Sequence, residues 1–436
     1  MLLALRASVV KIPLVAISSF YTPNNPLNTP YLHKLFIVTK QQKLILFILT
    51  SINFTHILDF MIMMPLSNYL MPAFKITPEQ FSYVVAAYSI SAGFSAFVAM
   101  FFVDNFDRKK VVLFAYTGFL IGTLCCGIAP SYIFILLARI VAGVFGGVLG
   151  AQVISIVADS FSYEIRGKAM GILFGAFSLA SVIGVPLSLT LADMVGWHAP
   201  FFFIVGIGAV VLFCIYNYLP SFNQHLVNKT HTSNNVWNTL QQIVFKRANL
   251  IAYALGGTLM MGHFLIIPFL NPYMQHNVGF NETQRKLVYI VGGLVSIFSA
   301  RIAGKLSDKY GKHTIFYICA IASLVPIYIV SHLGVMPYYY ALIITGIWFV
   351  FSTSRNIPAQ AIISNIVPPQ QRGSFQSFNS CVTSVFIGLA SLIAGKVVIA
   401  DETKKLHHYD TLGLISMSVV VVAIVIAGFI PRKSLP

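Results

Sequence analysis

The chain has 436 residues, of which 57% are hydrophobic and 9% are charged. Because about a quarter of the residues of a soluble domain are charged, this composition excludes a water-soluble globular protein. The net charge of +16 would favour nucleic-acid binding in a soluble chain, but the basic residues stand in short loops between apolar runs and indicate membrane orientation instead, so no nucleic-acid partner is expected.

The first 42 residues do not follow the apolar pattern of the rest. Arg6 and Lys11 interrupt a weak likeness to a signal peptide, and closely spaced prolines make the following stretch linker-like. We therefore predict an N-terminal extension over residues 1–42 that is disordered or reflects an over-called start codon, and we place it outside the fold.

Beyond this extension, apolar runs are long enough to cross about 30 Å of hydrocarbon as helices. The alternating pattern of an outer-membrane barrel is absent, which leaves helices as the spanning element. The sequence predicts an all-α membrane protein with 12 transmembrane helices. The predicted spans are 43–70, 79–103, 111–129, 131–158, 168–192, 200–219, 249–275, 284–306, 313–332, 337–366, 374–400 and 409–430.

The longest polar segment between spans separates the sixth span from the seventh. We predict an N-terminal six-helix bundle over 43–219, a central loop over 220–248, a C-terminal six-helix bundle over 249–430 and a tail over 431–436. Sixteen Lys and Arg residues fall on the side of the termini and the central loop, and five fall on the other side. Both termini and the central loop are therefore predicted to be cytoplasmic.

Cysteine and histidine patterns indicate no metal site. The 5 cysteines lie inside apolar stretches without a CxxC pair, so no disulfide, metal site or cofactor is expected. His407 and His408 stand in an outer loop and are interpreted as a solvated pair rather than as metal ligands.

The two predicted bundles contain matching segments. Pairs of positions recur at separations of 204 to 208 residues, which predicts two halves of like build related by an axis along the membrane normal. The matching positions are Asp104 and Asp308, Gln152 and Gln360, and Arg166-Gly167 and Arg372-Gly373.

The loops after the second and eighth spans carry a charged motif that resembles the signature loop of the major facilitator superfamily. The second copy retains Gly304, Leu306, Asp308, Lys309, Gly311 and Lys312. The first copy retains Asp104, Arg108 and Lys109 but has Met100 and Asp107 in place of glycines. The resemblance to this superfamily covers residues 43–430, essentially all of the predicted spanning chain.

The resemblance implies that these loops form a latch. In the superfamily the acid lies at the start of a neighbouring helix and holds span two against span eleven, and span eight against span five, in one of two states. Carried over, Asp104 would face the helix start near Gly373, and Asp308 the start near Gly167. Such a contact is worth about 0.3–1 kcal/mol when exposed. A charged loop that serves orientation alone is the alternative.

A glycine–proline pattern in span five resembles the motif of drug:proton antiporters, in particular of sugar-efflux-like members. Its residues are Gly171, Gly175, Gly184 and Pro186, with Ser188 where a glycine is common. We expect them to allow close helix approach and a kink. Small residues after Arg139 in the stretch ARIVAGVFGG fit the same branch.

Ionisable side chains inside spans are costly, about 2.5–3.5 kcal/mol each on insertion scales, and are functional candidates by default. Asp59 and Arg139, in spans one and four, lie at similar predicted depth and can pair. His56 precedes Asp59 by three residues, which places both on one helix face. We assign Asp59, Arg139 and His56 to proton coupling, with a static pair that staples two helices as the alternative.

The resemblance implies that spans one, four, seven and ten line a central cavity. We assign Arg355, His263, Trp348, Gln152 and Met63 to this substrate cavity. Arg355 is either a substrate contact or a helix staple, and His263 is interpreted as a hydrogen-bonded cavity residue. Two arginines against one aspartate disfavour dications as substrates.

These features predict a secondary transporter of the bacterial inner membrane, expected to be monomeric, that exchanges a small molecule such as a drug or sugar for protons. A proton-coupled uptake symporter on the same fold is the first alternative. A non-transporting membrane sensor is a more distant one. An enzyme is not expected, because HExxH, GxSxG and P-loop motifs are absent from the sequence.

Overall fold

The computed structural model describes residues 39–99, 101, 103–161, 163–223, 244–367 and 372–430. The predicted tail, residues 224–243 of the predicted central loop and the predicted extension up to residue 38 lie outside this part. The first helix begins at Lys40, because the Thr39 hydroxyl accepts from the Gln42 amide and the Gln42 side chain accepts from the Thr39 amide. The predicted start at residue 43 is thus three residues too late.

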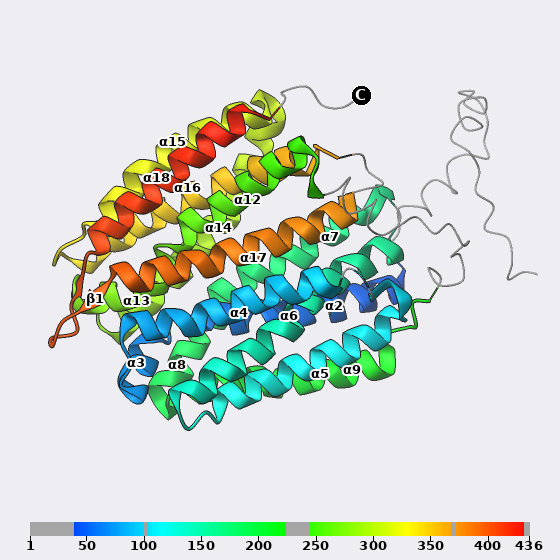
Figure 1. Ribbon diagram of the computed structural model, residues 1–436, viewed down its shortest axis with the longest axis horizontal. Helices are drawn as coiled ribbons and strands as arrows, with labels where there is room; N and C mark the ends of the chain where they lie inside the picture. The colour runs from blue at the N-terminus through cyan, green and yellow to red at the C-terminus, as the bar shows by residue number, and fades with distance from the viewer. Residues whose placement is uncertain are drawn as a thin grey trace, which may run out of the picture.

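Long helices run from one end of the described molecule to the other (Figure 1). Eleven segments of the described chain are long and apolar enough to cross a membrane. Helix α16 (Tyr338–Ser364), with 27 residues, is long enough to be a twelfth span, and its polar segment 352–356 makes it less apolar than the others. The prediction of an all-α membrane protein with twelve spans is confirmed.

The first six spans begin with one that is broken near its end by Pro65. Their elements are α2 (Lys40–Met63), α3 (Ser67–Phe74), α4 (Pro78–Ala99), the 3-10 turn η3 (Val103–Asn105), α5 (Arg108–Gly127), α6 (Tyr132–Ser160), α7 (Tyr163–Leu179), the π-helical segment η4 (Ala180–Gly184), α8 (Val185–Val195) and α9 (Ala199–Tyr218).

The last six spans likewise begin with a broken one. Their elements are α12 (Arg247–Phe264), α13 (Ile267–His276), α14 (Glu282–Tyr310), α15 (Lys312–Ser331), α16, α17 (Arg372–Val397), strands β1 (Ile399–Ala400) and β2 (Leu406–His407), and α18 (Tyr409–Gly428). The single helices predicted over 43–70 and 249–275 are therefore wrong. In the first, Pro65 cannot donate a helical hydrogen bond.

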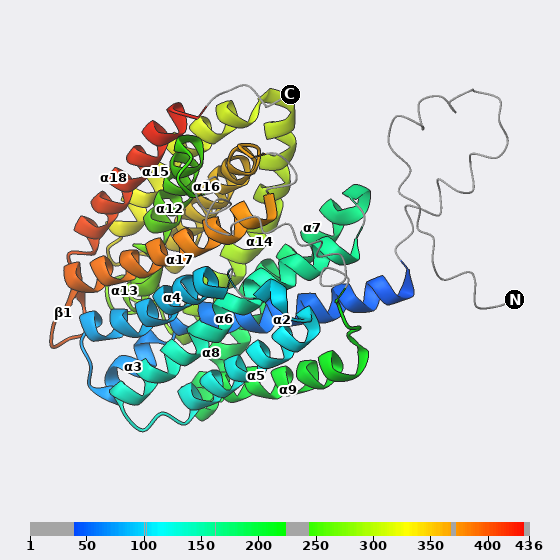
Figure 2. The same cartoon turned by 45° about the vertical axis from the view of Figure 1, so that its right-hand side comes forward.

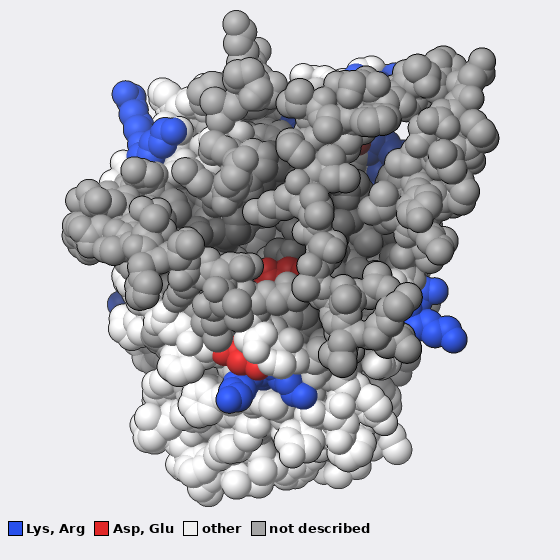
Figure 3. Space-filling model, turned by 90° about the vertical axis from the view of Figure 1, so that its right-hand side faces the viewer, with Lys and Arg blue, Asp and Glu red and all other residues white. Residues whose placement is uncertain are grey.

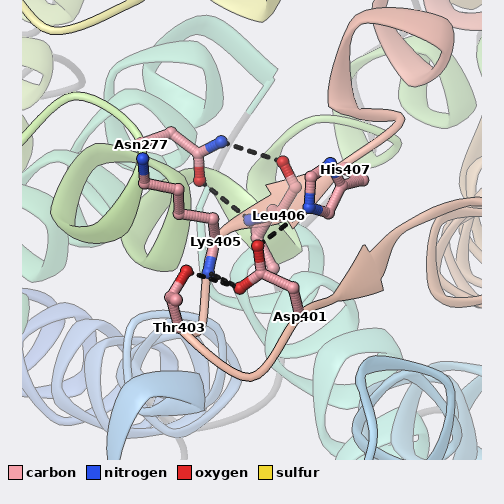
Figure 4. Close-up of polar contacts among 6 residues, drawn as sticks. All are labelled: Asn277, Asp401, Thr403, Lys405, Leu406 and His407. Carbon is pink, nitrogen blue, oxygen red and sulfur yellow. Dashed lines mark hydrogen bonds and ion pairs between the residues drawn. The ribbon is translucent and has the colours of Figure 1, made fainter.

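The two ends of the molecule differ. We call the end that holds residues 103–108 and Gly311 the motif end, and the end that holds β1 and β2 the hairpin end (Figure 1). At the hairpin end, the Asn277 amide bonds reciprocally with the backbone of Leu406, and Asp401 accepts from Thr403 and pairs with His407 at 2.9 Å (Figure 4). The Asn277 bonds anchor the exposed hairpin to the bundle, and the Asp401 contacts hold the hairpin itself together.

The hydrophobic core is shared at one end only. At the hairpin end, one cluster contains buried residues of both the first and the last six spans, from Leu58 to Val420. Toward the motif end the buried core divides into two clusters, one within residues 45–219 and one within 252–430. Among the described residues, the first and last six spans thus share a buried core at the hairpin end, whereas toward the motif end each half has its own core and the halves meet along helix seams.

Two helix seams join the first six spans to the last six. Helix α4, the second span, packs along α17, the eleventh, and the two lie side by side in both ribbon views (Figures 1 and 2). Helix α14, the eighth span, packs against η4 and α8 of the fifth. The seams are therefore made by corresponding spans of the two halves predicted from the sequence.

Candidate functional site

A cavity of about 420 Å³ lies where the core divides. Its lining residues lie in the middle part of the spans, and on α4, α6 and α17 mostly in the half nearer the motif end. They are contributed by residues 53–60 of α2, 88–96 of α4, 146–154 of α6, 173–177 of α7 and 376–387 of α17. The shared core therefore closes the hairpin-end side of the cavity, and on the other side the described buried residues form separate clusters in the two halves.

The cavity wall combines aromatic and uncharged polar side chains. Phe60 and Tyr88 stack at 5.7 Å on one side. On α17 a polar stripe, Gln376, Ser377, Ser380, Thr383 and Ser384, recurs at the three- and four-residue spacing of one helix face. The described lining includes no Asp, Glu, Lys or Arg. Such a wall suits an uncharged molecule with apolar and hydrogen-bonding parts.

Behind this wall lies an ion pair that is fully shielded from solvent. Arg139 on α6 donates from Nη1 to Oδ2 of Asp59 on α2 at 2.7 Å, and both side chains are 0% exposed. Thr123 of α5 donates to Oδ1 of the same carboxylate at 3.1 Å. The charge-assisted bond compensates part of the large cost of removing both charges from water.

Tyr88 connects the ion pair to the cavity. The guanidinium carbon of Arg139 lies 4.2 Å from the centre of the Tyr88 ring, a cation–π contact worth about 2 kcal/mol when desolvated. Oη of Tyr88 and Nε2 of His56 are buried without a hydrogen-bond partner among the described residues, and both residues line the cavity. These two polar atoms are available to a bound molecule or to a water chain.

The last six spans hold a second buried polar cluster. Arg355 of α16 is 0% exposed and donates from Nη1 to the Ser323 hydroxyl of α15 at 2.7 Å. Its Nε and Nη2 have no partner among the described residues. His263 stacks on Trp348 at 5.1 Å. His263 stands 204 residues after Asp59 and so occupies the matching position of the second half, whereas Arg355 stands 216 residues after Arg139 and does not share this separation.

The residues assigned to the substrate cavity from sequence do not line the described cavity. Arg355, His263 and Trp348 belong to the cluster just described, and Met63 is a buried residue of the shared core. Gln152 is 4% exposed on α6, next to lining residues but not among them. The polar stripe of α17 and the aromatic residues Phe60 and Tyr88 were missed. The stripe's helical spacing is a signal that could have identified it.

Polar contacts close the hairpin end between the first and the last six spans. Asp193 of α8 pairs with Lys286 of α14 at 2.6 Å and accepts from the Tyr69 hydroxyl of α3. The Asn271 amide of α13 donates to the carbonyl of Pro65 at the break in the first span, at 2.5 Å. The broken tips of spans one and seven thus touch, and the freed carbonyl is satisfied.

The charged loop after span two is held by contacts within the first six spans. Asp107 caps α5 by accepting from the Lys109 amide, and it also accepts from Ser221 and the Phe222 amide. Burial raises the pKa of Asp107, but these hydrogen bonds outweigh it and hold the pKa below its usual value. Arg108 pairs with Asp159 at 2.7 Å. Figure 3 views this end, where basic side chains lie at the periphery and also beside one of the two acidic patches nearer the middle.

The first and second motif copies differ for a backbone reason. Gly311 has φ +92, a conformation that favours glycine, whereas Asp107 at the matching position has φ −58 and needs none. Asp308 is exposed, Lys309 lies over the ring of Tyr310, and a Cβ on Gly304 would meet nothing within 4 Å. Packing in this conformation therefore does not require a glycine at position 304.

The predicted contacts of the latch acids lie outside the described residues. The side chains of Asp104, Arg166, Gly167, Arg372 and Gly373 are not described. Both latch contacts therefore stay predictions.

The glycine–proline motif of span five divides into two parts. A Cβ on Gly184 would lie 2.6 Å from Leu58, so this glycine permits close approach to the first span. Pro186 follows the π-helical segment, where the helical ladder is widened. A Cβ at Gly171 or Gly175 would meet nothing within 4 Å among the described residues, so for these two glycines close approach stays a prediction. Both lie on exposed positions of α7, where the core is divided.

Comparisons with known proteins point to one family. The sequence matches the family model of the Major Facilitator Superfamily over residues 49–391 and again over 254–434. It is 24% identical to Multidrug resistance protein 3 of Bacillus subtilis (strain 168) over 76% of this chain and 74% of that protein, and 24% identical to Multidrug resistance protein 2 of the same organism over 79% and 86%. The structure is similar to a D-xylose-proton symporter, with TM-score 0.73 and 15% identity over 90% of this chain and 99% of that one.

Proposed function

The chain belongs to the major facilitator superfamily, a family of transporters rather than enzymes, and from this membership we propose that it is a proton-coupled antiporter that exports a small molecule such as a drug or sugar. In this proposal the chain acts as a monomer in the bacterial inner membrane. The motif end and both termini face the cytoplasm, as the distribution of Lys and Arg predicts.

The observation that carries the proposal is the buried Asp59–Arg139 pair behind the cavity wall. Asp59 is a carboxylate with 0% exposure whose charge is compensated by one guanidinium contact and one hydroxyl. Binding of a proton removes its charge and frees Arg139, which then lacks a counter-ion. Arg139 also contacts the ring of Tyr88. A displacement of Arg139 would therefore remove a contact of Tyr88, which is part of the cavity wall. Proton and substrate therefore compete through Tyr88.

The divided core supports alternating access. A core shared by both halves only at the hairpin end, among the described residues, fits a carrier that is closed at that end and opens toward the motif end. Reversal requires the contacts of Asp193, Lys286 and Asn271 to break while the motif-end halves close. One elementary charge crossing the membrane is worth about 2.3 kcal/mol per 100 mV, which is sufficient to bias a two-state equilibrium of this kind.

The uncharged lining and the names of two relatives favour export of a neutral, amphipathic substrate. The described cavity wall lacks charged side chains, so a charged molecule would lose its hydration without a counter-ion. Two relatives carry the name multidrug resistance protein. That name describes those proteins, and it supports efflux over uptake for this one.

The direct test begins with a thermal-shift screen of the purified protein against sugars, nucleosides, amino acids and antibiotics. The best hit is then followed in proteoliposomes under an imposed pH gradient. We expect movement of the hit against the proton flow, and loss of gradient-driven flux in Asp59→Asn with exchange partly retained. Asp410→Asn, which removes an exposed acid at the start of α18, is the matched control. Movement of the hit together with protons would replace antiport by symport.

Two glycines of α6 provide a paired test of the cavity. A Cβ on Gly146 would lie 2.8 Å from Oη of Tyr88 and 2.9 Å from Nε2 of His56, whereas a Cβ on Gly150 would meet nothing within 4 Å. Both glycines line the cavity. We expect Gly146→Ala to weaken binding of the hit and Gly150→Ala to leave it unchanged. Equal affinities in the two variants would exclude this part of the cavity as the substrate site.

A further inference from the structure

A second hollow lies on the outside of the bundle, away from the substrate cavity. It has a volume of about 590 Å³ and is formed by α4, α5 and α6. Its rim includes Phe94 and Phe114, which are 67% and 72% exposed. Its floor includes the small buried residues Ser95 and Ala115. In a membrane-spanning chain, apolar side chains exposed on the outside of the bundle face acyl chains, so this groove opens into the lipid.

The groove has one charged residue among its described lining, and this residue lies at the motif end. Lys110 is the third residue of α5. Helix α5 has 20 residues, a length of about 30 Å, so its first turn lies at the depth of the lipid headgroups. Phe114 lies four residues further on, about 6 Å deeper. The groove therefore runs from headgroup depth into the hydrocarbon.

The basic residues beside Lys110 are already engaged by the protein. Arg108 pairs with Asp159, and Lys109 donates to the carbonyl of Tyr216 at 2.9 Å. Lys110 is exposed and its ammonium makes no hydrogen bond or ion pair within the described chain. A flexible lysine at this depth is suited to a phosphate group, with its methylene stem along the apolar wall.

We propose that this groove is a binding site for an anionic phospholipid of the leaflet at the motif end. One acyl chain lies between the aromatic residues of the rim, and the phosphate group binds Lys110. The apolar floor selects a hydrocarbon chain, and Lys110, the one cation of the described lining, selects a negatively charged headgroup over a zwitterionic one. The site is independent of the transported substrate and of proton coupling.

Native mass spectrometry of the full chain in detergent, titrated with phosphatidylglycerol or phosphatidylcholine, tests the proposal. We expect phosphatidylglycerol to bind more tightly than phosphatidylcholine, and Lys110→Gln to weaken phosphatidylglycerol binding about fivefold, the effect typical of one basic residue at a membrane surface. Lys309→Gln is the matched control, because it removes an exposed lysine at the same end but outside the groove.

A second variant tests the apolar part of the groove. Val98 lines it and is 37% exposed, so Val98→Trp should fill it without a change of charge and weaken binding of both lipids. Equal affinity of the wild-type chain for the two lipids would overturn the proposal. So would unchanged phosphatidylglycerol binding in Lys110→Gln, or an equal loss in Lys309→Gln.

Discussion

Removal of both partners of the Asp59–Arg139 pair should cost less stability than the two single removals added together. Each side chain is 0% exposed and the two are joined at 2.7 Å. Asp59→Asn leaves a buried guanidinium with the Tyr88 ring as its main remaining partner, and Arg139→Gln leaves a buried carboxylate with Thr123. An uncompensated charge at such depth costs about 3–5 kcal/mol.

The double variant Asp59→Asn/Arg139→Gln carries neither charge of the pair. Its two amides can still hydrogen-bond to each other and to Thr123. We therefore expect its loss of unfolding free energy to be smaller than the sum of the two single losses by about 2–3 kcal/mol.

A double-mutant cycle by denaturant titration in detergent micelles measures this coupling. The pair of Asp193 and Lys286, whose side chains are 10% and 20% exposed, supplies an internal reference. Because partly exposed pairs are solvated, its coupling should be about 1 kcal/mol or less. If the losses at Asp59 and Arg139 add to within about 0.5 kcal/mol, the two side chains do not act as a buried ion pair and the reasoning fails.

Three further perturbations have distinct expected outcomes. Lys286→Gln removes the ion pair with Asp193 that joins the two halves at the hairpin end, so spin-label distances across that end should lengthen; an unchanged distribution would reject this contact as a closing element. Arg355→Met removes a buried cation without a counter-ion in the described chain and should raise the free energy of unfolding by about 1–3 kcal/mol; a loss of stability would identify a helix staple instead. Hydrogen bonds from Thr403 and His407 lower the pKa of Asp401 to about 2, so its stabilising effect on the hairpin is present above pH about 4 and is lost as the pH falls toward 2. Hydrogen exchange of hairpin amides should reveal this opening, and Asp401→Asn should open the hairpin at every pH in that range.

Local sequence properties were sufficient to predict the fold class and the ends of most spans. A helix that crosses lipid must satisfy its backbone internally and present apolar side chains over about 20 residues, so hydropathy alone locates it. The same rule singled out Asp59 and Arg139, because a charge within a span is rare and their predicted depths matched. The match between Asp104 and Asp308 indicated the repeat without any structural information.

The tertiary structure decided what surrounds the passage. Hydropathy reports that a residue lies in a span, but the rotation of each helix depends on how twelve helices cross. Because helix rotation was not predictable, two positions were misjudged. Arg355 and Trp348 were expected in the cavity but lie in a separate buried cluster. The polar stripe of α17 was overlooked but lines the cavity. The free faces of Gly171 and Gly175 depend on which end of the bundle is closed. That choice rests on contacts between segments about 90 to 210 residues apart, such as Asp193 with Lys286 and Pro65 with Asn271, which no local pattern encodes.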